Sequence, residues 1–169
     1  RRPYDIGDRV QIGELIGDVV DVRPLHTYLL EVGNWVHADQ STGRVVHVPN
    51  SFAFTKPVYN YTEGFPYVWN EIPVLVTFES DWRRAKELLE QIARDESRDL
   101  SDRMSELLTQ MQRDYPIRYR HLSPIVYTRI ADSGVLLTVR YLTEARQRRQ
   151  TLNDISERIL TAFAAEPHV

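Results

Sequence analysis

The first third of the chain alternates between apolar and polar positions with a period of two. Val10 and Ile12 alternate with Arg9 and Gln11, a pattern typical of a strand with one buried face. Five short strands so close together predict a small β-barrel over residues 1–62. The other four stretches with this alternation are residues 20–23, 28–32, 45–48 and 52–60.

Two glycines mark bends in this barrel. Gly7 and Asp8 form a turn signal just before the first strand. Gly17 stands where the alternation loses its parity, because Ile16 fits the phase of the following strand and Asp18 does not. A β-bulge or tight bend at Gly17 explains the loss, and a side chain there would resist it. Small barrels need such corners in order to close.

A third break follows the fourth strand, where Pro49, Asn50 and Ser51 separate two apolar runs. Proline fixes φ, asparagine tolerates the left-handed region, and serine can hydrogen-bond its own backbone. These three residues are predicted to redirect the chain so that a fifth strand closes the barrel. That strand is expected over residues 52–60, broken by Pro57.

The second part of the chain mixes helical and strand patterns. Residues 61–71 are rich in aromatic side chains and are interpreted as a linker, after which a strand is predicted at 72–78. Asp81 can cap the helix that follows. The order β-α-β-β-α predicts a ferredoxin-like domain over residues 63–169 that lacks its last strand, so the chain is of the α+β class. The remaining elements are a helical pattern to about Arg113, a strand after Pro124, a return strand after the hairpin signal at 131–134, and a helix over 152–163.

Composition and charge narrow the function classes. The net charge of −3 does not favour a nucleic-acid partner, because Lys and Arg supply most of the affinity for phosphates. The chain has no cysteine, which excludes disulfides and Cys-based zinc or thiol chemistry. No apolar run reaches the length of about 18 residues that a membrane-spanning helix needs.

Candidate chemistry is sparse. His26, His37 and His47 lie in the barrel half with Asp39 nearby, but no local spacing places two metal ligands on one element. Surface or strand histidines are the favoured interpretation, so no metal and no cofactor is predicted. No nucleophile motif is present, and a turn role suffices for Ser51. An enzyme or metal-site protein stays open as an alternative.

Aromatic residues gather between residues 52 and 69 and raise a second alternative. Such side chains can form a stacking platform for single-stranded nucleic acid. Because they follow strand alternation and then cross the linker, core and inter-domain packing is the favoured interpretation. A soluble nucleic-acid-binding module built on a small barrel stays open as the alternative. The aromatic residues are Phe52, Phe54, Tyr59, Tyr61, Phe65, Tyr67 and Trp69.

An ordered series of motifs resembles a known family. The stretches DIGDRVQIG, LIGDVVDVR and RVVHVPNS, followed by Asn60-Tyr61-Thr62, are similar to the soluble part of the small-conductance mechanosensitive channel (MscS) family. In that family a Gly-Asp/Glu turn opens the β-domain, a Gly-x-Val strand follows, and an Ile/Val-Pro-Asn-Ser/Gly loop precedes a strand ending in Asn-x-Ser/Thr. Further along, FESDWRRAKELLEQI and LNDISERILTAF are similar to the family's capped helix and last helix.

The resemblance implies a set of expectations. The barrel is Sm-like, the protein is a homo-oligomer, usually a heptamer, and transmembrane helices in the cell (inner) membrane precede this region. The region forms a hollow cytoplasmic vestibule with side portals. The channel opens under membrane tension and releases ions and small osmolytes in hypo-osmotic shock, with no enzymatic step and no nucleic acid. The important residues are then structural rather than catalytic, namely Gly7, Asp8, Gly17, Pro49, Asn50, Ser51 and Asn60.

Two departures from the family pattern carry expectations of their own. The segment 33–43 is long for a hairpin loop, which indicates a divergent subfamily. Its Trp35 and His37 are candidates for contact with a neighbouring subunit, and a plain surface loop is the alternative. The chain also stops where the family continues into a last strand, which indicates a truncated chain or a natural end. The strand at 72–78 is then expected at a sheet edge, where Pro73 is tolerated.

Overall fold

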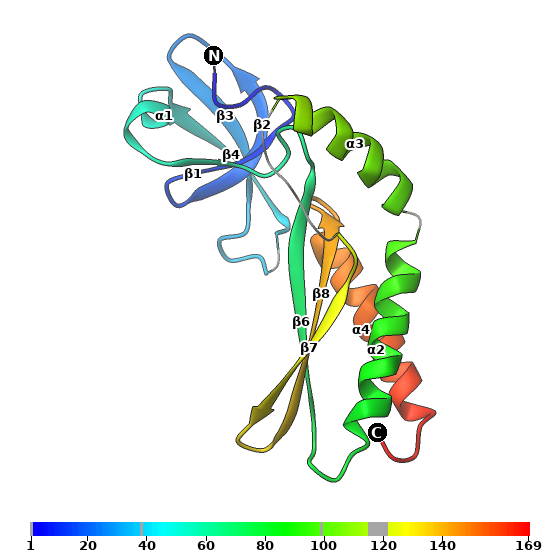
Figure 1. Ribbon diagram of the computed structural model, residues 1–169. Coiled ribbons are helices and arrows are strands. Elements are labelled where there is room, and N and C mark those ends of the chain that lie inside the picture. Colours follow the sequence, from blue (N-terminus) through cyan, green and yellow to red (C-terminus); the bar gives the residue numbers. More distant parts are fainter. Residues whose placement is uncertain (1, 38, 99, 115–121) are drawn as a thin grey trace. The chain divides into compact units, whose positions relative to one another are not determined.

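The structure, a computed structural model, describes residues 2–37, 39–98, 100–114 and 122–169 (Figure 1). This described part contains four helices and two sheets, so the predicted α+β class is confirmed. The chain divides into two compact units. The first unit holds residues 1–67 together with 144–149, and the second holds 68–143 together with 150–169.

The first unit is built on one five-stranded sheet. Neighbouring strands pair antiparallel, and their alternate side chains form one core. The predicted alternation is thus confirmed for β1 and β4. In β2 and β3 the period of two holds but the phase differs from the predicted one, because Val19 and Leu29 are buried while Val20 is exposed. The strands, in the order β4-β3-β2-β1-β5, are β1 (Arg9–Ile12), β2 (Leu15–Val22), β3 (His26–Val32), β4 (Ser41–Pro49) and β5 (Val58–Asn60). The buried members of the core are Tyr4, Val10, Ile12, Val19, Leu29 and Val48.

The pairing of β2 with β3 contains a β-bulge. Val19 and Asp21 pair with consecutive residues of β3, so Val20 is the extra residue. The sequence predicts a bulge or a tight bend at Gly17, and the bulge is wrong, because Gly17 pairs regularly with both neighbouring strands. The bulge falls at Val20 because that side chain is 47% exposed, so displacing it leaves the core intact.

The prediction of a single strand over residues 52–60 is also wrong. Residues Phe52–Thr55 form a one-turn helix, α1, and only β5 is extended. The carbonyl of Ser51 accepts hydrogen bonds from the amide of Phe54 and from Thr55 Oγ1, each over 3.1 Å, which closes the turn. Pro57 then ends the helix, because the residue before a proline is confined to the extended region that Lys56 adopts.

The second unit contains a three-stranded sheet in the order β6-β8-β7. The strands β7 and β8 form the predicted antiparallel hairpin. Within the described residues β6 lies at a sheet edge, as expected, and Pro73 is exposed there. The elements are β6 (Tyr67–Val76), α2 (Trp82–Ser97), α3 (Leu100–Asp114), β7 (Ile125–Ala131), β8 (Gly134–Glu144) and α4 (Arg148–Ala164).

The helices α2 and α4 share one core with this sheet (Figure 1). Asp81 caps α2 as predicted, since its carboxylate accepts from the amide of Arg84 over 3.0 Å. The linker predicted at 61–71 is wrong from Tyr67 onward, because those residues already belong to β6. Among the described residues, no helix combines the length and the apolar character that crossing a membrane requires. The buried helix residues of this core are Ala85, Leu89, Ile92, Ala93, Ile155 and Ile159.

Candidate functional site

The turn that opens the first unit is tied to β2 by backbone hydrogen bonds. The amide of Gly7 donates to the carbonyl of Val19, and the amide of Val19 donates to the carbonyl of Asp8, each over 2.8 Å. The amide of Asp8 donates to Asp5 over 3.1 Å and closes the turn itself. Gly7 has φ +96°, a conformation that glycine adopts without steric cost. This turn, called the opening turn below, is therefore anchored on the sheet that it precedes.

The carboxylate of Asp8 joins the opening turn to the end of β5. Its Oδ2 accepts from Asn60 Nδ2 over 2.8 Å, and its Oδ1 accepts from Thr62 Oγ1 over 3.1 Å. Asn60 Oδ1 in turn accepts from the amides of Thr62 and Glu63, over 3.0 and 2.9 Å. The sequence singles out Gly7, Asp8 and Asn60 separately, and the structure brings all three into one network. The same network adds Thr62, the last position of the Asn-x-Ser/Thr pattern.

A largely buried ion pair lies beside the opening turn, and sequence reasoning missed it. Arg9 Nε and Nη2 donate to the two carboxylate oxygens of Asp18, each over 2.9 Å. Burial disfavours the charged form of Asp18, but the hydrogen bonds and charges of Arg9 and Arg146 outweigh it, so the pKa of Asp18 lies below its ordinary value. A signal was present, because opposite charges stand directly across from each other on β1 and β2.

The turn after β4 is held by the side chain of Asn50. Its Nδ2 donates to the carbonyls of Arg23 and Pro24, over 2.8 and 3.1 Å, and its Oδ1 accepts from Thr27 Oγ1 over 2.8 Å. Its amide donates to the carbonyl of Leu25 over 2.9 Å. Asn50 thus joins the β2–β3 turn to the start of α1.

The predicted backbone chemistry of this turn needs two corrections. Among the described non-glycine residues, only Asn34 and Asp39 have positive φ, so Asn50 does not use the left-handed region. Ser51 has φ −60° and ψ −24°, and its side chain makes no capping hydrogen bond. Pro49 ends β4 opposite His26, as a proline that donates no hydrogen bond can. The turn is therefore set by the long-range contacts of Asn50 rather than by local φ preferences.

The loop between β3 and β4 contacts a distant segment of its own chain. Asp39 pairs with Arg148 Nε over 2.6 Å, and the carbonyl of His37 accepts from Arg149 Nη1 over 3.0 Å. Trp35 is exposed, with the guanidinium carbon of Arg44 4.4 Å from its ring centroid. The carbonyl of His37 is thus engaged within the chain, and contact of Trp35 and the His37 ring with a neighbouring subunit stays a prediction.

The histidines of the first unit do not converge. In residues 2–37 and 39–67, as in the rest of the described chain, no three His, Cys, Asp or Glu residues are grouped as metal ligands. The ring of His47 lies tilted against the ring of Tyr28 with centroids 4.4 Å apart, and Asp39 is paired with Arg148. The arrangement gives no support to the metal-site alternative.

Glu31 holds the base of the β3–β4 loop. Arg44 Nη2 and Nε donate to its two oxygens over 2.6 and 2.7 Å, and Thr42 Oγ1 donates over 2.7 Å. Asn34 Nδ2 adds a longer contact of 3.4 Å. Glu31 is only 4% exposed. The hydrogen bonds from Arg44 and then Thr42 lower its pKa from 4.5 to about 2, against the opposing effect of burial.

The low pKa of Glu31 makes the stability of the first unit depend on pH. The unfolded chain binds this proton near pH 4.5 and the folded chain only near pH 2, so the stabilisation is fully present above about 4.5 and is lost as the pH falls through about 2. Urea unfolding across this range should show that the stability difference between the wild type and Glu31→Gln shrinks toward acid. A difference that stays constant with pH would contradict the assignment.

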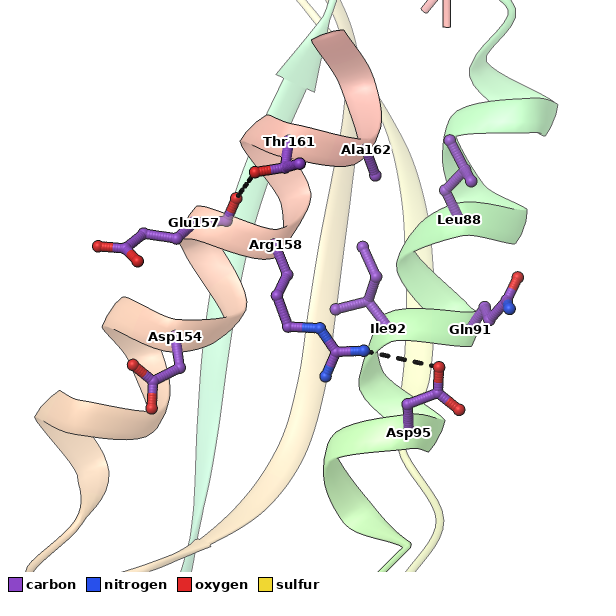
Figure 2. Close-up of a pocket in the computed structure, with 9 residues that line it drawn as sticks. All are labelled: Leu88, Gln91, Ile92, Asp95, Asp154, Glu157, Arg158, Thr161 and Ala162. Atoms are coloured by element: carbon purple, nitrogen blue, oxygen red, sulfur yellow. Dashed lines mark hydrogen bonds and ion pairs between the residues drawn. The ribbon is translucent and has the colours of Figure 1, made fainter. Parts of the chain in front are cut away.

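The second unit carries a surface groove between α2 and α4 (Figure 2). Arg158 reaches from α4 toward α2 and pairs with Asp95 and Glu96, at 3.6 and 3.1 Å. The hydroxyl of Thr161 is bonded to the carbonyl of Glu157 over 2.8 Å, so the lining offers no nucleophile next to a base. The groove is a seam between helices held by ion pairs. It encloses about 630 Å³ and is lined by Leu88, Gln91, Ile92, Asp95, Asp154, Glu157, Arg158, Thr161 and Ala162.

Comparison with known proteins finds a family for the first unit. Residues 1–63 match the family described as "Mechanosensitive ion channel, beta-domain". The matched stretch contains β1 to β5 and both ends of the network around Asp8. No curated protein matches the chain.

Two solved structures share the fold of nearly the whole chain. MscS of Helicobacter pylori in its closed state is 18% identical, with a TM-score of 0.64, over 98% of this chain and 55% of that one. MSL1 of Arabidopsis thaliana is 18% identical, with a TM-score of 0.57, over 95% of this chain and 49% of that one. The chain therefore spans about half the length of the solved structures that it matches.

Proposed function

We propose that the chain belongs to the mechanosensitive ion channel family, as its resemblance predicted, and that it forms the cytoplasmic part of an MscS-type channel; the family match over residues 1–63 supports this. The observation that carries this proposal is the family match over the whole first sheet and the network of the opening turn. In the proposed channel, membrane helices precede this region in the inner membrane. The proposal involves no enzymatic step and no cofactor.

We propose two domains, an Sm-like barrel over residues 1–62 and a ferredoxin-like domain over 63–169 without its last strand. The order β4-β3-β2-β1-β5 supports the first, because it places the last strand beside the first, as a curled sheet requires. The order β6-β8-β7, with α2 and α4 on one face, supports the second.

The proposed assembly is a homo-oligomer, and the resemblance to the MscS family favours a heptamer. In the described part of the first unit, β4 and β5 are the two edges of one sheet, and unpaired edges are ready to pair with another chain. The β4 edge of one copy can accept the β5 edge of the next, a head-to-tail contact that closes into a ring. Val45 on β4 is 52% exposed, as expected of a residue that a neighbour would cover.

The opening turn gives this assembly a mechanical role. Its bonds to β2 and β5 fix the point at which the pore helix would enter the ring of sheets. Membrane tension that moves the pore helix would then act against the rigid ring formed by the sheets of the subunits. The ring would open the pore to ions and small osmolytes, which leave the cell through the vestibule in hypo-osmotic shock.

The channel function can be tested on the full-length protein in bacterial cells that lack their own mechanosensitive channels. We expect it to rescue survival of hypo-osmotic shock and to give currents in membrane patches under suction. The proposal would be overturned by protein that reaches the membrane but gives neither rescue nor current.

The assembly can be tested through the mass of the purified full-length protein in detergent. Light scattering should give a multimer for the wild type, and Val45→Lys should shift the mass toward the monomer, because an edge lysine opposes strand pairing. Val20→Lys is the matched control, since Val20 is similarly exposed, at 47%, but lies on the interior strand β2. A monomeric wild type, or equal masses for both variants, would contradict pairing through β4.

A further inference from the structure

The segment Glu144–Arg149 is distant in sequence from the first unit but belongs to it. It lies at the junction of β8 and α4 and reads EARQRR, with three arginines in its last four positions. The amide of Ala145 donates to the carbonyl of Pro66 over 2.9 Å, and Ala145 is buried. The backbone of the segment is therefore anchored at Ala145, and the three arginines follow this anchor.

Each of the three guanidinium groups binds the first unit at a different place. Arg146 contacts the carbonyl of Gly7 in the opening turn and Asp18 Oδ1 on β2, the latter at 3.4 Å. Arg148 pairs with Asp39, and Arg149 donates to the carbonyl of His37, both in the β3–β4 loop. One short segment thus contacts the opening turn, β2 and the β3–β4 loop.

We propose that residues 144–149 form an electrostatic latch on the opening turn, which closes at low ionic strength and opens at high ionic strength. The latch itself is argued from contacts within the first unit. Its consequence for gating rests on the proposed channel function, in which the opening turn follows the pore helix.

The arginines of the latch are exposed, and their carboxylate partners Asp18 and Asp39 are partly exposed, which makes these ion pairs sensitive to salt. The side chains of Arg146 and Arg148 are 47% and 42% exposed. Exposed pairs are individually weak, and their attraction is screened once the Debye length falls from about 30 Å at 0.01 M salt to about 3 Å at 1 M. The pair between Arg9 and Asp18 is largely buried and is screened much less.

The chemistry of Asp18 allows the latch to open without leaving an unpaired buried charge. Arg9 already satisfies both carboxylate oxygens of Asp18 at 2.9 Å, and Arg146 is a second partner. When Arg146 leaves, Asp18 keeps its bidentate pair and Arg146 moves into water. A buried pair with a single partner would instead resist opening strongly. The contact between Arg146 and Asp18 can therefore break and re-form without leaving Asp18 unpaired.

The direction of the effect follows from this screening. Dilution of the cell interior during hypo-osmotic swelling lowers the ionic strength around the region, and the attraction between Arg146 and Asp18 grows. The opening turn is then held most firmly in a swollen cell. The latch would therefore couple the fixation of the pore entrance to the salt content of the cytoplasm.

The test is hydrogen exchange, measured by mass spectrometry on the 169-residue chain in low and high NaCl, from about 0.02 M to about 0.5 M. In the wild type, peptides that cover residues 4–9 and 33–41 should exchange several-fold faster at high salt. In Arg146→Gln, peptide 4–9 should exchange fast at both concentrations, while in Arg148→Gln this should hold for peptide 33–41. Sucrose of equal osmolality should have no such effect, because it does not screen charge.

Two further variants keep the outcome interpretable. Arg94→Gln removes an exposed pair with Glu90 on α2 and should leave both peptides as in the wild type. Arg146→Lys keeps the charge and should retain part of the salt dependence, which separates loss of the latch from loss of folding. Salt-independent exchange in the wild type, or a salt response of Arg146→Gln equal to that of the wild type, would overturn the latch. A latch seen in this chain beside a full-length protein that conducts no ions would overturn the channel function alone.

Discussion

Replacement of Gly134 by alanine is expected to destabilise the second unit by about 3 kcal/mol. A Cβ at this position would lie 2.0 Å from the carbonyl oxygen of Val76 and 3.0 Å from its carbonyl carbon. Both contacts are with backbone atoms of β6, so no side-chain rotation can relieve them. The strand β8 would have to move away from β6, and the hydrogen bonds between the two strands would be strained.

The effect of Gly134→Ala should be confined to the second unit. Hydrogen exchange should rise in β6, β7 and β8, while β1 to β5 keep the protection of the wild type, and urea unfolding should give the size of the loss. Ser133→Ala is the matched control, because Ser133 is an exposed neighbour in the same hairpin. Equal stability of the two variants would show that β6 and β8 do not approach as closely as described.

Replacement of Gly17 by valine is expected to destabilise the first unit by about 2 to 3 kcal/mol. A Cβ on Gly17 would lie 2.7 Å from the carbonyl oxygen of Leu30 and 2.9 Å from the Cβ of Leu29. Leu29 is a fully buried member of the core, so it has no room to yield. The reason for glycine at this position is close approach of β3, whereas the sequence suggests a bend.

Gly33→Ala is the control that separates the cost of a steric clash with a neighbouring strand from the cost of backbone strain. Gly33 has φ +85° and open space around an added Cβ, so the variant should cost only about 1 kcal/mol, from the left-handed backbone alone. Gly17→Ala should fall between this control and Gly17→Val in a thermal or urea unfolding series. Gly17→Val with the stability of Gly33→Ala would contradict the tight packing of β2 against β3.

The alternation of apolar and polar residues located the strands β1 to β4 of the first unit. It failed for the segment after Ser51, whose secondary structure depends on contacts with residues distant in sequence. Alternation located β1 to β4 because one face of each strand is buried. The run after Ser51 has the same apolar character, yet it forms α1, because Asn50 is fixed by residues 23–27. A short apolar run cannot be assigned to strand or helix from periodicity alone.

The candidate site shows the same division. Gly7, Asp8 and Asn60 were found because their residue types carry turn chemistry and a family motif. The role of Arg9 was missed because its place across from Asp18 shows only once β1 and β2 are in register, and the role of Arg146 was missed because nothing local marks it as a partner of Asp18. Arg146 lies 128 positions away from that carboxylate, and single-sequence patterns hold no information over such a distance. Contacts of this kind become visible only once the strands are in register.

The position of the segment 144–149 has a consequence for synthesis of the protein on the ribosome. The contact between Arg146 and Gly7 joins residues 139 positions apart, although both belong to the first unit. The strands β1 to β5 are translated early and can pair as soon as they leave the exit tunnel. Their opening turn and β3–β4 loop gain the contacts with residues 144–149 only after nearly the entire chain has been translated. The part of the protein that is synthesised first is therefore the last to reach its complete set of contacts.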